Sequence, residues 1–150
     1  MHRISGILCT LMLLGGALFA QTTRVYSDPE IAFQEARHWI SEGKHNLAYP
    51  ILQELQQKRH VQPSAFSEER ISWIQFHAIE CELHLLLPSA ETDARSFLSE
   101  KHHAHLHRMM YYHLGHYYHL QQDYEKALDC FAGSGKESLT NEQLGNLKFE

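Results

Sequence analysis

The stretch 111–131, YYHLGHYYHLQQDYEKALDCF, constrains the fold more than any other part of this chain. Its small and aromatic residues fall at fixed offsets, at Leu114, Gly115, Tyr118, Tyr124, Ala127 and Phe131. The spacing predicts two helices that pack face to face, with Asp123 as the cap of the second. Gly115 removes side-chain bulk where the helices cross, Ala127 lets the two backbones approach, and Phe131 fills the remaining gap.

This pattern resembles the tetratricopeptide repeat (TPR), a helical hairpin of about 34 residues. Ala36, Trp39 and Ala48 repeat the intervals of 9 and 12 residues that separate Tyr118 and Gly115 from Ala127, and Ala94 takes the corresponding place in the middle segment. We therefore expect an all-α domain at 28–150, with helical hairpins near 29–58, 67–100 and 104–134. A partial repeat at 140–150 would supply one unpaired terminal helix. The resemblance implies a right-handed superhelical array.

Turn and cap residues predict where the first hairpin begins and turns. Asp28 and Pro29 offer a cap and a first helical residue, and Gly43 ends that helix. Asn46 is expected to cap the next helix. Pro50 would then lie in its first turn, where a missing N–H costs least.

Residues 1–20 read as a secretory signal peptide, because His2 and Arg3 precede an apolar run that is followed by small residues. We expect cleavage after Ala20, with a retained N-terminal anchor as the alternative, and a flexible leader at 21–27. Export would leave Cys81 and Cys130, which we expect to be buried free thiols, with a disulfide as the alternative.

The segments DYEKALDCF and LTNEQLGNLKFE resemble the large exported TPR proteins of Bacteroidetes-type bacteria, in which a signal peptide precedes many repeats. The resemblance implies a non-enzymatic scaffold for protein or peptide partners, located in the periplasm or at the outer membrane. It leaves peripheral association with the membrane open. The alternative is that the chain is the front part of a larger sensing or assembly protein.

In TPR proteins the first helix of each hairpin lines a concave groove, which suits an extended peptide or a partner helix. The resemblance implies that the contact residues here are Phe33, Arg37, Met109, Tyr112, His116, His119 and Leu120. For Phe33 and Tyr112 the alternative is packing against the adjacent repeat.

Histidine is the unusual feature of the composition, with 13 residues. His103 and His107 are four residues apart, and His113, His116 and His119 step by three, a spacing that drifts around a helix. No Asp or Glu lies between residues 101 and 122 to complete a metal site. We therefore predict no metal ligand and no cofactor, with a His-rich metal-binding protein as the alternative.

Other functional classes find little support in the sequence. The net charge of −5 argues against a nucleic-acid-binding module. There is no HExxH zinc signature and no GxSxG nucleophile elbow, so we predict no catalytic residue. The acidic residues of the middle segment are expected on solvated outer helix faces: Glu68, Glu69, Glu80 and Glu82.

Overall fold

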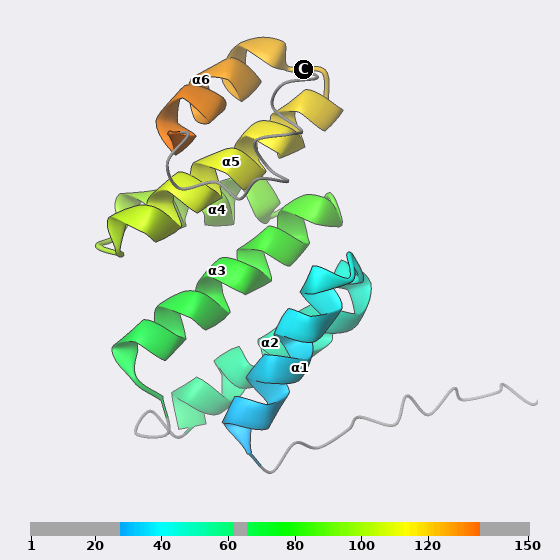
Figure 1. The fold of residues 1–150 in the computed structure, drawn as a ribbon, viewed down its shortest axis with the longest axis vertical. Coiled ribbons are helices and arrows are strands. Elements are labelled where there is room, and N and C mark those ends of the chain that lie inside the picture. The colour runs from blue at the N-terminus through cyan, green and yellow to red at the C-terminus, as the bar shows by residue number, and fades with distance from the viewer. Residues whose placement is uncertain (1–27, 62–65, 136–150) are drawn as a thin grey trace, which may run out of the picture.

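The computed structural model describes residues 28–61 and 66–135, which contain six helices and no strand. The all-α class is therefore confirmed. Consecutive helices form three hairpins that follow one another along the long axis of the molecule (Figure 1). The helices are α1 (Pro29–Ser41), α2 (His45–Val61), α3 (Glu68–His84), α4 (Ala90–Ser99), α5 (Ala104–Leu120) and α6 (Tyr124–Ser134).

Three of the sequence predictions concern residues outside the described ranges: the signal peptide at 1–20, the leader at 21–27 and the terminal helix at 140–150. Within the described ranges, no helix is both long enough and apolar enough to cross a membrane.

The turns inside the three hairpins share one backbone geometry. Two residues after the end of each first helix lies a residue with positive φ: Gly43 (70°), Leu86 (53°) and Gln122 (65°). Such a left-handed residue after a helix is typical of the Schellman motif, which satisfies carbonyl groups at the end of the helix. In each turn the next residue donates its N–H to the carbonyl five residues back: Lys44 to Trp39 (2.8 Å), Leu87 to Glu82 (3.0 Å) and Asp123 to Tyr118 (3.0 Å).

We expect Gln122→Gly to stabilise the protein by about 0.5–1 kcal/mol, because glycine adopts the left-handed conformation without the steric cost that a side chain carries. Urea unfolding followed by circular dichroism measures the change. The control is Gln121→Gly, one residue earlier, where φ is −87° and glycine brings only its entropic cost. Equal effects at both positions would contradict the role assigned to the turn.

The beginnings of the second helices match the predictions in one hairpin and differ in another. Asp123 caps α6, since its side chain accepts the N–H of Lys126 at 3.4 Å. The prediction for α2 was wrong: the helix begins at His45, not after Asn46. Pro50 therefore lies beyond the first turn and withholds an N–H from the carbonyl of Asn46. Asn46 is exposed, so water can take the place of that donor.

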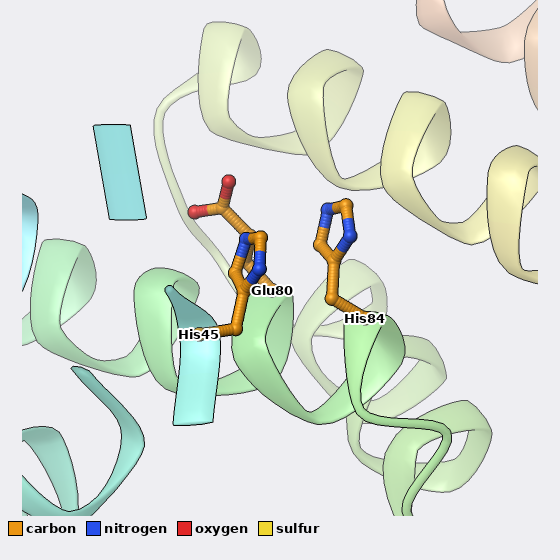
Figure 2. Close-up of side chains that lie close together, drawn as sticks. All are labelled: His45, Glu80 and His84. Carbon is orange, nitrogen blue, oxygen red and sulfur yellow. The ribbon is translucent and has the colours of Figure 1, made fainter. Parts of the chain in front are cut away.

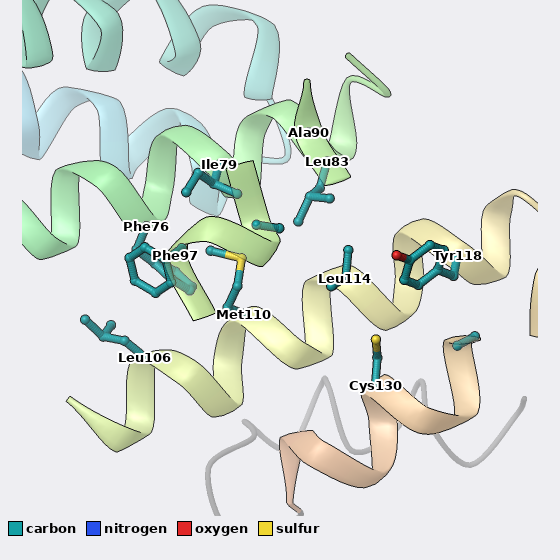
Figure 3. Close-up of a cluster of buried hydrophobic side chains, with 12 residues drawn as sticks. Phe76, Ile79, Leu83, Ala90, Phe97, Leu106, Met110, Leu114, Tyr118 and Cys130 are labelled. Carbon is teal, nitrogen blue, oxygen red and sulfur yellow. The ribbon is translucent and has the colours of Figure 1, made fainter. Parts of the chain in front are cut away.

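Two apolar cores share α3. One lies between α1, α2 and α3, and the other joins α3, α4, α5 and α6 (Figure 3). Trp73 packs against both cores. In the second core Phe76 and Phe97 are fully buried. Burial of each side chain stabilises the folded state by about 2–3 kcal/mol, because its apolar surface is removed from water.

The residues of the predicted repeat signature lie mostly in these two cores. Those buried are Ala36, Ala48, Ala94, Leu114, Tyr118 and Ala127. Trp39 and Phe131 are partly buried and pack against the cores. Tyr124 differs from the prediction: it is the first residue of α6, is 56% exposed, and lies beside His119 with 5.6 Å between ring centroids.

Gly115 faces Phe131 across the third hairpin, as the sequence predicts. A Cβ atom at position 115 would lie 2.6 Å from Cε1 of Phe131, closer than van der Waals contact allows. The absence of a side chain on α5 therefore lets the ring of Phe131 lie directly against the backbone. This contact fixes how closely α5 and α6 approach.

We expect Gly115→Ala to lower the free energy of unfolding by about 1 kcal/mol, because the clash with Phe131 outweighs the better helix propensity of alanine. In a Phe131→Ala background the same change should stabilise by about 0.5–1 kcal/mol, since only the propensity gain remains. Denaturant unfolding of the four proteins in this cycle measures the coupling. A Gly115→Ala effect with the same sign in both backgrounds would refute the contact.

A polar network joins the second hairpin to the third. The hydroxyl of Tyr118 on α5 donates to Oε1 of Glu91 on α4 at 2.6 Å and accepts from Arg95 at 2.6 Å. Arg95 also donates to the same carboxylate at 3.0 Å. The sequence predicts only packing for Tyr118. In the structure its hydroxyl also forms hydrogen bonds that link the two hairpins.

The two cysteines among the described residues lie in different cores, Cys81 in the first and Cys130 in the second, and both are buried free thiols. The prediction of free thiols is confirmed. Burial raises the pKa of both thiols, which keeps them protonated.

Candidate functional site

The predicted contact residues do not form one continuous exposed surface. Arg37 and Leu120 are exposed, and Leu120 presents 62% of its surface to solvent. Met109, His116 and His119 are partly buried. Phe33 and Tyr112 are buried, with 1% and 4% exposure.

Burial of Phe33 and Tyr112 corrects the prediction that they face a partner. The guanidinium carbon of Arg70, on α3, lies 4.3 Å from the ring centroid of Phe33, so the second hairpin covers this residue of the first. Tyr112 packs edge-on against His116, with 4.7 Å between ring centroids, and its hydroxyl lies 2.9 Å from Nε2 of that residue. The next hairpin therefore covers Phe33, whereas Tyr112 packs within its own hairpin, against His116 of α5 and Phe131 of α6.

The histidines that step by three along α5 turn to three different neighbours. His113 lies against Glu80, His116 against Tyr112, and His119 against Tyr124. The expectation that these three cannot share one metal ion agrees with this divergence.

The polar centre of the molecule is Glu80, on α3. The prediction that it lies on a solvated outer face was wrong, because α3 is enclosed by other helices and Glu80 is only 7% exposed. Its Oε2 lies 2.7 Å from Nδ1 of His77, and its Oε1 lies 3.4 Å from Nε2 of His113. Two histidines, from α3 and α5, therefore partner one buried carboxylate.

These contacts assign the tautomers of the two histidines. A carboxylate only accepts, so the protons lie on Nδ1 of His77 and on Nε2 of His113. The opposite ring nitrogens, Nε2 of His77 and Nδ1 of His113, are both buried without a hydrogen-bond partner. Each imidazole thus turns one nitrogen to the carboxylate and leaves the other without a described partner.

The pKa of Glu80 agrees with an ionised carboxylate at this buried position. Burial alone would raise the pKa of Glu80, but attraction to His113 and the hydrogen bond from His77 outweigh it and lower this pKa to about 2. Burial lowers the pKa of His113 despite the opposing effect of Glu80. Glu80 is therefore ionised at neutral pH.

Two further histidines extend this centre toward solvent. His84 lies four residues after Glu80, on the same face of α3, and His45 is the first residue of α2. Their rings stack in parallel, with 3.9 Å between centroids and 8° between planes. The ligand atoms of His45, Glu80 and His84 all lie within 4.8 Å of one another, and the three side chains project to the same side (Figure 2).

This grouping escapes a search for acidic residues confined to 101–122, because Glu80 lies outside that segment. The spacing of Glu80 and His84 was readable as a carboxylate and an imidazole on one helix face. Whether His45 and His113 lie near Glu80 depends on which helices pack against α3, and the sequence alone does not specify this packing. The arrangement offers one carboxylate and two imidazole nitrogens as electron-pair donors.

We expect acid to destabilise the fold between pH 6.5 and 4 through His84. Burial is the largest cause that lowers its pKa from 6.5 to about 4, and His45, His113 and His116 add to this effect while Glu80 opposes it. The unfolded chain binds more protons in this range, so stability is complete above pH 6.5 and is lost as the pH falls toward 4.

Urea unfolding at several pH values measures this effect. His84→Gln should flatten the decline between pH 6.5 and 4, whereas His38→Gln, at an exposed position of α1, should leave it unchanged. An unaltered decline in the His84 variant would show that other groups cause the acid sensitivity.

No protein-family model, no curated protein and no solved structure matches the chain. We therefore argue its function from its own residues and their arrangement.

Proposed function

We propose that this protein is a non-enzymatic, TPR-like scaffold of the exported or envelope compartment, and that it binds a partner helix or an extended peptide. The array would be a right-handed superhelix of helical hairpins. Contacts along such an array are local, so each hairpin presents its own side chains to a partner.

The observation that carries this proposal is the recurrence of one turn geometry in all three hairpins. Gly43, Leu86 and Gln122 occupy the same left-handed position with the same pattern of backbone hydrogen bonds. Glycine is the usual residue there, so its presence in only one of the three turns indicates a repeated structural unit that has diverged in sequence. Repeated helical hairpins are typical of proteins that bind other proteins.

The third hairpin supplies the most suitable contact surface among the described residues. Leu120 and Tyr124 are exposed, and the ring of His119 lies beside that of Tyr124. We define these three residues as the contact patch. Exposed apolar and aromatic groups beside an imidazole suit the apolar face of an amphipathic helix.

The shape of the surface is consistent with a binding scaffold. Two hollows of about 220 and 230 Å³ are lined mainly by polar side chains, and each is smaller than the cavities of about 300–1,000 Å³ that usually enclose small molecules. A partner that lies across the surface fits this shape better than an enclosed ligand.

We expect a Leu120→Glu variant to bind helical peptides selected on the wild-type chain at least tenfold more weakly, because a charge would enter the apolar contact. Fluorescence anisotropy with a labelled selected peptide measures the affinity. Leu47→Glu is the matched control, since Leu47 is also an exposed leucine on a helix but belongs to the first hairpin.

Two results would overturn the proposed contact patch. One is a selection that enriches no helical or extended peptide on the wild-type chain. The other is an equal loss of affinity in the Leu47 and Leu120 variants, with both proteins keeping the wild-type melting temperature. Fractionation of the producing cell tests the compartment separately.

A further inference from the structure

We propose that His45, Glu80 and His84 form a binding site for one divalent transition-metal ion, with Zn²⁺ as the ion that these ligands suit best. Two imidazole nitrogens and one carboxylate oxygen are a frequent donor set for zinc in proteins. The three side chains come from the start of α2 and the last two turns of α3. This site is independent of the contact patch on the third hairpin.

The distances are close to those that a metal ion needs. The three ligand atoms lie within 4.8 Å of one another. Around zinc, with bonds of about 2.0–2.2 Å, ligand atoms of a tetrahedron are about 3.3 Å apart. The ligand atoms therefore have to draw together by at most about 1.5 Å. His45 and His84 each lie at a helix end and are in contact with solvent, so their rings can turn without disturbing a core.

The charge of Glu80 favours a cation at this place. Its described ion-pair contacts come from His77 and His113, and no lysine or arginine of the described residues pairs with it. A buried carboxylate needs a positive charge nearby. A divalent ion next to Glu80 would supply a permanent one.

The neighbours of Glu80 would act as the outer shell of the site. His77 donates an N–H to one oxygen of the carboxylate at 2.7 Å, and Nε2 of His113 lies 3.4 Å from the other oxygen, so both histidines fix its orientation. A carboxylate has about four lone-pair sites, so one remains for a metal ion. Ligating carboxylates that are themselves hydrogen-bonded are a regular feature of metal sites in proteins.

Metal binding would join the first hairpin to the second. His45 belongs to α2, whereas Glu80 and His84 belong to α3. Three protein ligands leave the fourth position of zinc for water, on the side where His84 is exposed. An ion held in this way fixes the angle between two hairpins and should raise the melting temperature.

Titration of the full chain with Co²⁺ tests the site, because cobalt in place of zinc has visible absorption that reports its coordination. We expect one tightly bound ion per chain, the intense spectrum of four-coordinate cobalt, and displacement by Zn²⁺. In His84→Gln and in His45→Gln the affinity should fall at least tenfold. The control variants are His38→Gln and His105→Gln, which remove exposed histidines outside the site and should bind as the wild type does.

Circular dichroism melting in EDTA shows whether each variant is folded. A rise in melting temperature with Zn²⁺ in the wild type and the two control variants, but not in the two site variants, would support the crosslink. The proposal fails if the wild type shows no four-coordinate spectrum. It also fails if both site variants keep wild-type affinity, or if His38→Gln or His105→Gln loses as much affinity as they do. None of these results bears on peptide binding through Leu120, so the scaffold proposal stands or falls separately.

Discussion

The enclosure of α3 by its neighbours is the constraint on which the rest of the structure depends. Residues 76–81 are all buried, because helices from all three hairpins pack against this one helix. A carboxylate in such a place needs polar partners that also fit an enclosed space. The imidazole of His77 meets this requirement, since it donates an N–H to Glu80 while its ring packs against Trp73 and Phe76. The richness in histidine thus has a structural explanation at His77 and His113.

The turns show what sequence reasoning can and cannot reach. Gly43 and Asp123 mark a helix end and a helix start through backbone effects that act locally, so the sequence predicts both. Leu86 and Gln122 adopt the same left-handed conformation as Gly43, yet neither residue type indicates it. The misplaced start of α2 has a similar origin. Asn46 is a good cap by residue type. The carbonyl of Lys44, at the end of the preceding turn, already accepts the first hydrogen bonds of the helix, so the helix begins at His45.

Tertiary packing determines the candidate sites more than it determines where the helices form. The sequence predicted the contact of Gly115 with Phe131, because both residues belong to one hairpin and their separation is fixed by it. The burial of Phe33 arises from Arg70 in the next hairpin, which a repeat pattern does not specify. The surroundings of Glu80 could not be predicted for the same reason. Its partner His113 is 33 residues away in sequence and lies beside it only because α5 packs against α3.

Because Cys81 and Cys130 lie in different cores, their oxidation would report on two different opening motions of the chain. Cys81 is fully enclosed in the core of the first two hairpins, and Cys130 keeps 8% of its surface exposed in the other core. Only the thiolate reacts readily with oxidants, and burial keeps both groups protonated. In an oxidising surrounding each cysteine would thus be modified only as its own core opens. The rate of oxidation of Cys130 would report how often α6 frays. The rate of oxidation of Cys81 would report how often the first hairpin separates from the second.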